Sequence, residues 1–110
     1  MPTAVDIFCG SGGVTQGLCS ARWRVLAACD NDPVAAATYR ANHPRTKLVD
    51  GDIRLDDTID RIASAVRGRA VDLLVICAPC QPFSSQNRHR GDDEREQLIV
   101  RALAVAERLK

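Results

Sequence analysis

The chain has 110 residues and a formal net charge of +1, which suits one domain and carries no general signal for nucleic-acid binding. Its five cysteines stand at irregular spacing and make a poor disulfide framework, and no apolar run is long enough to span a bilayer. We therefore expect a reduced, cytoplasmic protein with free thiols, no signal peptide and no membrane segment.

The first half of the chain alternates short apolar runs with helical patterns. Leu18 is the clearest core candidate of the first helix, and Asp32 before Pro33 is expected to cap the second. The expected elements are strands 3–8, 24–29 and 46–49, and helices 14–22 and 33–42, with Asp30 closing the second strand.

The second half predicts two more helices around the strongest strand, 71–77, whose continuous hydrophobicity suggests burial on both faces. Asp56 or Asp57 is expected to cap one helix, Gly68 to end it, and Asp93 with Glu96 to begin the last. The expected buried residues are Ile59, Ile62, Ala63 and Val66 in the first of these helices, and Ile99, Ala102, Leu103 and Ala106 in the last.

This strict alternation of strand and helix predicts an α/β fold, a parallel sheet with helices on both faces. If the strands are ordered 3-2-1-4, strand 71–77 lies at an edge. A long apolar edge strand promotes aggregation unless another strand pairs with it. We therefore expect the chain to be a fragment, or one piece of a split enzyme.

A glycine turn, with Gly10, Gly12 and Gly13, follows the first strand, and Asp30 ends the second about twenty residues later. Such a turn admits a ligand close to the backbone, and a carboxylate there can bind ribose hydroxyls. The dinucleotide fingerprint needs a third glycine where Thr15 stands, which favours a nucleoside cofactor without phosphates, such as S-adenosylmethionine. A turn that only reverses the chain is the alternative.

Asp52, in Gly51-Asp52-Ile53, follows the third strand. It belongs to the same carboxyl edge, where open α/β sheets bind ligands, and could accept a hydrogen bond from an adenine amino group. Taken alone, it could equally begin a turn.

The segment from Cys77 to Ser84 follows the strongest strand and allows three interpretations. Its C-x-x-C spacing could serve zinc or redox chemistry, but no second cysteine pair completes a zinc site, and we expect no metal. Alternatively, Cys77 is a buried strand residue and Cys80 a reactive thiol, held by flanking prolines. In the third interpretation Cys80 is a small apolar residue in a tight turn.

These segments together resemble the cytosine-C5 DNA methyltransferases over nearly the whole chain. The matching motifs, in order, are Asp6–Gly13 (DIFCGSGG), Asp30, Gly51-Asp52-Ile53, and Pro79–Ser84 (PCQPFS), followed by Asp93, Arg95 and Leu98. The proline-cysteine-glutamine motif is the specific one. The resemblance implies a Rossmann-like S-adenosylmethionine-dependent methyltransferase fold, with residues 1–110 forming part of a catalytic domain.

The resemblance also implies roles for single residues. Phe8 would stack on the adenine of S-adenosylmethionine, with Ile53 packing on the same ring. Asp52 would bind the adenine amino group and Asp30 the ribose. The remaining cofactor-binding residues would be Asp6, Gly10, Gly12, Gly13 and Pro79.

Cys80 would be the nucleophile of a DNA (cytosine-5-)-methyltransferase that acts on a cytosine flipped out of the duplex. Attack of its thiolate at C6 makes C5 nucleophilic and divides one difficult step into easier ones. The DNA-contacting loop would carry Gln81, Ser84, Ser85, Arg88 and Arg90, with arginines suited to phosphates.

Two substitutions and several absent motifs depart from the family pattern. Asn87 and Glu96 stand where glycines are usual. The Glu-Asn-Val motif, the target-recognition domain and the closing cofactor motif do not occur, so we expect a complementing chain to supply them. The alternatives are a catalytically inactive cofactor- or DNA-binding remnant, a tRNA cytosine-C5 methyltransferase and, least favoured, a nicotinamide dehydrogenase.

Overall fold

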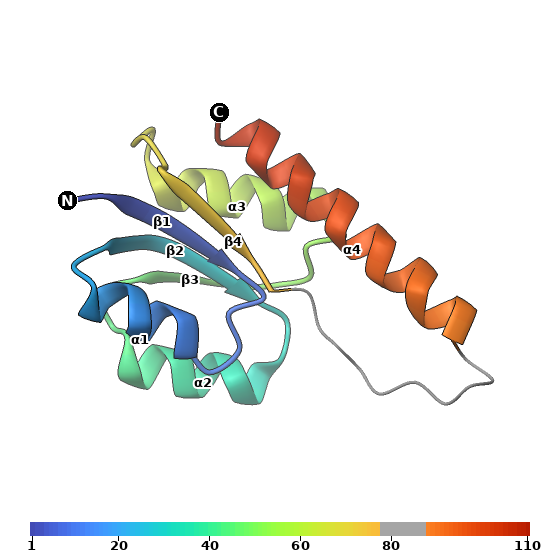
Figure 1. The fold of residues 1–110 in the computed structure, drawn as a ribbon, viewed down its shortest axis with the longest axis horizontal. Coiled ribbons are helices and arrows are strands. Elements are labelled where there is room, and N and C mark those ends of the chain that lie inside the picture. The colour runs from blue at the N-terminus through green and yellow to red at the C-terminus, as the bar shows by residue number, and fades with distance from the viewer. Residues whose placement is uncertain (78–87) are drawn as a thin grey trace.

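The computed structural model describes residues 1–77 and 88–110, except for the side chains of residues 88–93. Strands and helices alternate along the chain, as the sequence predicts (Figure 1). The elements are β1 (Thr3–Ile7), α1 (Gly13–Ser20), β2 (Arg24–Asp30), α2 (Pro33–Asn42), β3 (Lys47–Asp50), α3 (Asp56–Val66), β4 (Leu73–Ile76) and α4 (Arg88–Arg108).

The four strands form one parallel sheet in the order β3-β2-β1-β4, which confirms the α/β class and the predicted strand order. Ile7 of β1 pairs with Cys29 of β2 on one side and with Ile76 of β4 on the other. The carboxyl ends of these strands therefore lie at the same rim of the sheet.

Helices cover both faces of this sheet, with α1 and α2 on one side and α3 and α4 on the other (Figure 1). β1 is buried along its whole length, and its side chains alternate between the two faces. Val5 and Ile7 pack with Ile62 and Val105 in the larger core cluster, on the side of α3 and α4. Asp6 points to the other side, toward α1.

The helix ends follow the sequence prediction at α2 and depart from it at α3. Asp32 accepts a hydrogen bond from the Val34 N–H at 3.0 Å and caps α2, with Pro33 in the first turn. At α3 the cap position is Leu55, and Asp56 and Asp57 lie in the first turn, so the predicted aspartate cap is wrong. Both side chains still place negative charge at the positive end of the helix dipole.

The far end of α3 also differs slightly from prediction. Arg67, not Gly68, is the C-cap, although both residues have left-handed backbone, with φ of 56° and 71°. The predicted buried face of α3 is confirmed for Ile59, Ile62 and Val66, whereas Ala63 is half-buried.

The edge position of β4 corrects the predicted burial of the strand on both faces. Leu73 is exposed and the other three residues of β4 are half-buried, because β1 is its only neighbour in the described sheet. Cys77, expected to be a buried strand residue, lies beyond β4 and is exposed.

Two helices bury different residues from those predicted. In α1 the buried residue is Thr15, while Leu18 is half-buried. α4 begins at Arg88, so Asp93 lies inside it and does not cap it. The inward stripe of α4 runs through Leu98, Ala102 and Val105, which confirms the prediction for Ala102, whereas the predicted Ile99, Leu103 and Ala106 are exposed.

None of the helices within residues 1–77 and 88–110 is both long and apolar enough to cross a membrane.

Candidate functional site

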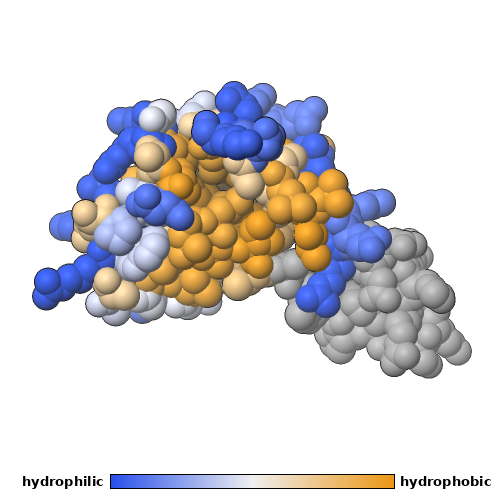
Figure 2. All heavy atoms as spheres, turned by 45° about the horizontal axis from the view of Figure 1, so that its top comes forward, coloured by the Kyte–Doolittle hydropathy of each residue, from blue (hydrophilic) through white to orange (hydrophobic). Residues whose placement is uncertain are grey.

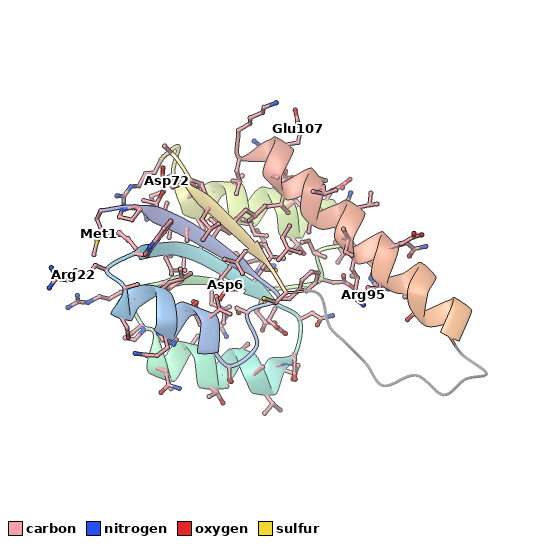
Figure 3. The ribbon with its side chains drawn as sticks, in the orientation of Figure 1. Met1, Asp6, Arg22, Asp72, Arg95 and Glu107 are labelled. Carbon is pink, nitrogen blue, oxygen red and sulfur yellow. The ribbon has the colours of Figure 1, made fainter. Side chains whose placement is uncertain are left out.

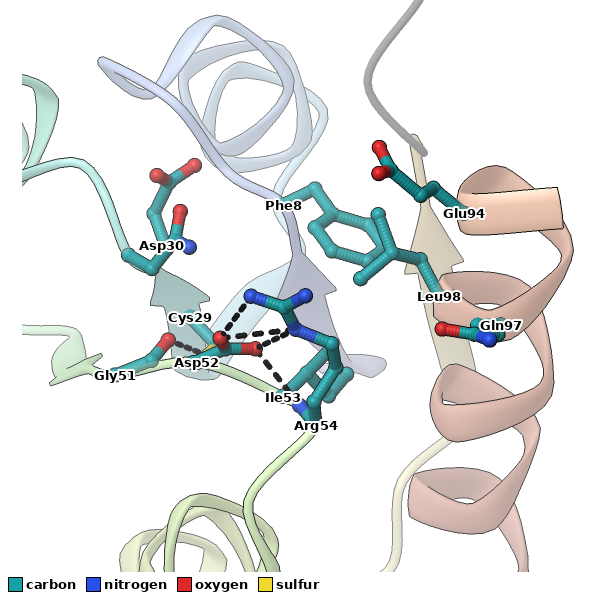
Figure 4. A pocket seen from close by; sticks show the side chains of 11 residues that line it. Phe8, Cys29, Asp30, Gly51, Asp52, Ile53, Arg54, Glu94, Gln97 and Leu98 are labelled. Carbon is teal, nitrogen blue, oxygen red and sulfur yellow. Dashed lines mark hydrogen bonds and ion pairs between the residues drawn. The ribbon is translucent and has the colours of Figure 1, made fainter. Parts of the chain in front are cut away.

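A pocket of about 200 Å³ opens at the carboxyl rim of the sheet, between the ends of β1, β2 and β3 and the side of α4 (Figure 4). Parallel strands bring their carboxyl-end loops together at such a rim, which is where open α/β sheets bind ligands. The lining residues are Phe8, Cys29, Asp30, Asn31, Gly51, Asp52, Ile53, Arg54, Glu94, Gln97 and Leu98.

The glycine turn adjoins this pocket and has an unusual backbone. Phe8, Gly10 and Gly12 have φ of 61°, 56° and 107°, in the left-handed region that glycine tolerates and phenylalanine adopts at a cost. A Cβ on Gly12 would come within 2.7 Å of the His43 ring, so only glycine fits there without movement. Gly12 therefore packs closely against His43, whereas a Cβ on Gly10 or Gly13 would meet nothing within 4 Å.

Asp30 supports this turn directly. Its Oδ2 accepts a hydrogen bond from the Gly10 N–H at 2.8 Å, and its Oδ1 accepts one from the Asp32 N–H at 2.9 Å. An ionised carboxylate has about four acceptor positions, so both oxygens keep capacity for a ligand hydroxyl. The sequence predicts the ligand-binding role of Asp30 but not its structural one.

Asp52 forms a close ion pair with Arg54, a residue that the sequence analysis missed. The Arg54 Nη2 lies 2.6 Å from Oδ2, and the Arg54 main-chain N–H donates to Oδ1 at 2.9 Å. Hydrogen bonds from Arg54 hold the pKa of the Asp52 carboxyl below its usual range. Asp52 is therefore a negatively charged acceptor, and the donor that it binds is Arg54 of the same loop (Figure 4).

A buried polar chain starts at Asp6, which is labelled in Figure 3, and lies beneath the turn on the α1 and α2 side of the sheet. The Thr15 hydroxyl donates to Asp6 Oδ2 at 2.8 Å and shares a 2.7 Å hydrogen bond with the Tyr39 hydroxyl. All three side chains are fully buried, and Asp6 Oδ1 has no partner among the described residues. Burial raises the pKa of Asp6, and it raises the pKa of Tyr39 to about 12.

The described cysteines differ sharply in environment. Burial raises the pKa of both the Cys9 and the Cys29 thiols to about 12, so neither forms a thiolate near neutral pH. Cys19 and Cys77 are exposed. Cys80 lies outside the described residues.

The structure brings several predicted site residues together. Phe8, Asp30, Asp52 and Ile53 line one pocket, with the turn of Gly10, Gly12 and Gly13 beside it. The Cys77 N–H donates to the Ile7 carbonyl at 3.4 Å, so the chain leaves β4 at this same rim. Pro79, Cys80, Gln81, Ser84 and Ser85 lie outside the described residues.

The last helix contributes a wall of the pocket, and of its residues the sequence pattern included only Leu98. Glu94, Gln97 and Leu98 of α4 line the pocket opposite Asp52 and Ile53. The backbone of Arg88 and Arg90 belongs to α4, which corrects their placement in the preceding loop. Across the part of the chain that the structure describes, no group of three or more His, Cys, Asp or Glu side chains could hold a metal ion.

Comparison with known proteins places this architecture in a family. Residues 3–110 match the family model described as C-5 cytosine-specific DNA methylase. The chain is 33% identical over 111 residues to type II methyltransferase M.XorII of Xanthomonas oryzae, covering 99% of this chain and 26% of that protein. It is 37% identical over 100 residues to type II methyltransferase M.AgeI of Thalassovita gelatinovora, covering 87% of this chain and 23% of that protein.

A solved structure agrees with these relatives. The crystal structure of a putative DNA modification methyltransferase encoded within an E. coli prophage superposes with a TM-score of 0.77 at 28% identity, over 99% of this chain and 29% of that one. The chain thus spans about a quarter of the length of the curated relatives named above. With its sheet order, rim pocket and nearly complete match to the family model, the chain belongs to the C-5 cytosine-specific DNA methylase family.

Proposed function

We propose that this chain is the cofactor-binding and nucleophile-bearing part of a DNA (cytosine-5-)-methyltransferase. One observation carries the proposal: in a chain of this family, an aromatic ring and two carboxylates converge on one pocket beside a glycine turn. An aromatic face, hydrogen-bond acceptors and an open backbone suit a nucleoside cofactor.

The residues around the pocket fit S-adenosylmethionine, which when bound supplies an electrophilic methyl group. Phe8 and Ile53 provide apolar surface for adenine, Asp52 an acceptor for its amino group, and Asp30 acceptors for ribose hydroxyls. The turn of Gly10, Gly12 and Gly13 would admit the methionine portion. The buried Asp6 carboxyl oxygen without a described partner suits an ammonium group, and Pro79 would complete the site.

Cys80 is the proposed nucleophile. Its thiolate adds to C6 of a flipped cytosine, which forms a C–S bond and places an electron pair at C5. After C5 is methylated, loss of the C5 proton restores the ring double bond and expels the thiolate. Gln81, Ser84 and Ser85 would contact DNA with the arginines that begin α4, because such side chains bind phosphate and base groups.

This chain spans about a quarter of the length of its relatives, and two alternatives to independent turnover follow. In the first, the chain binds cofactor but needs a complementing chain for turnover. In the second, it is an inactive cofactor- or DNA-binding remnant. A tRNA substrate is the alternative to DNA.

Covalent trapping tests the proposal. The purified chain is mixed with S-adenosylmethionine and duplex DNA containing 5-fluorocytosine, with and without the remaining portion of M.XorII as a separate polypeptide. Fluorine cannot leave as a proton does, so an adduct persists and can be mapped by mass spectrometry. We expect an adduct on Cys80 that the Cys80→Ser variant loses and the Cys77→Ser variant keeps.

The same experiment separates the alternatives. No adduct in either arm would reject the catalytic proposal, while S-adenosylmethionine binding without an adduct would favour the remnant. Trapping of 5-fluorocytosine in tRNA in place of DNA would favour the tRNA enzyme.

A further inference from the structure

Arg101 ties α4 to the loop between β3 and α3. Its Nε donates to the Ile53 carbonyl oxygen at 3.2 Å, and its Nη2 lies 2.7 Å from Asp56 Oδ1. The Arg101 side chain is 28% exposed, whereas Asp56 is 91% exposed. The bond to Ile53 is thus the more buried of the two.

One end of this link lines the pocket, and the other lies one helical turn from residues that do. Ile53 lines the pocket and is only 3% exposed, so its position is set by the core beneath it. Gln97 and Leu98, which line the opposite wall, lie one helical turn before Arg101 on α4. Leu98 and Ile53 also pack in the same hydrophobic cluster.

The internal bonds of the loop do not reach α4. The Arg54 and Leu55 main-chain N–H groups both donate to Asp52, at 2.9 Å and 3.0 Å, and these bonds shape the turn only. The Arg101 side chain adds a hydrogen bond from α4 to the backbone of this turn, beside the electrostatic interaction between Glu94 of α4 and Arg54.

A second ion pair between α3 and α4 provides a comparison. Arg108 lies 3.8 Å from Asp60, and both side chains are more than half exposed. Exposed pairs of this kind contribute little, and neither residue lines the pocket. Arg101 differs from Arg108 in its bond to a backbone carbonyl of the pocket wall.

We propose that Arg101 is a positioning residue for the cofactor. By holding α4 against the Ile53 carbonyl, it fixes the separation between the wall of Gln97 and Leu98 and the wall of Ile53. It thereby sets the affinity for the adenosine part of the ligand. This inference rests on the proposed cofactor function.

Calorimetric titration with S-adenosylhomocysteine tests the inference. Arg101→Met keeps the apolar stem of the side chain but removes its donors, and we expect it to weaken binding about fivefold or more. Arg101→Lys, which can still donate to the Ile53 carbonyl, should recover part of the affinity. Asp56→Ala and Arg108→Met should leave the dissociation constant within about twofold of wild type.

Chemical denaturation of each variant separates affinity from stability. Equal affinity of Arg101→Met and Arg108→Met, with both variants shown to be folded, would overturn the inference while leaving the cofactor site intact. A loss in Asp56→Ala equal to that in Arg101→Met would also overturn it, by assigning the effect to the exposed ion pair. No binding by wild type would reject the proposed function and this inference together.

Discussion

The Gly10 main-chain N–H donates to Asp30 Oδ2 at 2.8 Å, joining the end of β2 to the turn after β1. The second oxygen of the same carboxylate accepts from the Asp32 N–H. The residue that is proposed to bind the ribose therefore also shapes the backbone on which the rest of the cofactor would lie.

Asp30→Ala should lower both stability and cofactor affinity. The substitution removes the acceptor of two backbone N–H groups, one of them partly buried, and we expect a loss of about 1–2 kcal/mol in the free energy of unfolding. Asp30→Asn keeps one acceptor oxygen and should lose less. Urea denaturation measures the difference, and equal stability of Asp30→Ala and wild type would contradict the anchoring role.

Gly12→Ala should destabilise the glycine turn. The new Cβ would approach the His43 ring to 2.7 Å at a backbone φ of 107°, so we expect a loss of about 1–3 kcal/mol in the free energy of unfolding. Gly17→Ala is the matched control, because its Cβ would meet nothing within 4 Å in α1. That control should gain about 0.5–1 kcal/mol by helix propensity. Similar effects of the two substitutions would argue against a special conformation at Gly12.

The element order and the sheet edge could be predicted because they follow from local patterns. The Asp32 and Pro33 cap depends on two adjacent residues, and parallel strands necessarily bring Asp30 and Asp52 to one rim. The pairing of the β2 and β3 ends, with Asp30 opposite Asp50, is a direct consequence of that topology.

The orientation of α4 could not be predicted in the same way. Two apolar stripes satisfy helical spacing, one through Leu98, Ala102 and Val105 and one through Ile99 and Leu103, and only the packing partner chooses between them. Arg54 and Arg101 were missed for a related reason. A charged residue in a sequence does not reveal which carboxylate or carbonyl it meets in the fold.

Asp6→Asn should change how stability depends on pH. Because burial raises the pKa of Asp6 in the folded protein, its contribution is fully present below the unfolded pKa, about 4, and is lost as pH rises through the folded value. The asparagine variant cannot ionise, so its stability relative to wild type should increase over that interval. Asp30 and His43 also act electrostatically on the Asp6 carboxyl, and Asp6 acts on the nearby Cys9 thiol. The comparison with wild type therefore changes Asp6 alone and leaves these three groups in place.

Denaturation from pH 3 upward, in steps of about half a unit, measures this effect. A difference between the two proteins that stays constant with pH would show that Asp6 titrates as it does in the unfolded chain.

Arg54→Gln should raise the pKa of Asp52 and strengthen binding of an adenosine ligand. Hydrogen bonds from Arg54 lower that pKa, and its donors use the same carboxylate that is proposed to bind the adenine amino group. An exposed ion pair is weak, so relief of the competition should tighten S-adenosylhomocysteine binding by up to about fivefold.

Carboxyl NMR titration and calorimetry measure these two effects, with Arg61→Gln as the control of equal charge change, because Arg61 contacts the neighbouring Asp50 carbonyl. Weaker binding in Arg54→Gln would instead identify Arg54 as a ligand contact.

The apolar surface of β4 and α4 should make the isolated chain self-associate. Leu73 is 38% exposed on the edge strand, and Val100 and Leu103 of α4 are 62% and 57% exposed. Hydrophobic side chains gather on this side of the molecule (Figure 2). Unpaired strand edges and exposed apolar patches both promote association, and the proposed complementing segment would cover them. Light scattering after size exclusion should show wild type associating as concentration rises and Leu103→Lys remaining smaller. Val34→Lys, which changes a 75% exposed apolar position on α2, is the control and should associate as wild type does. A wild-type protein that stays monomeric at high concentration would argue that this surface needs no partner.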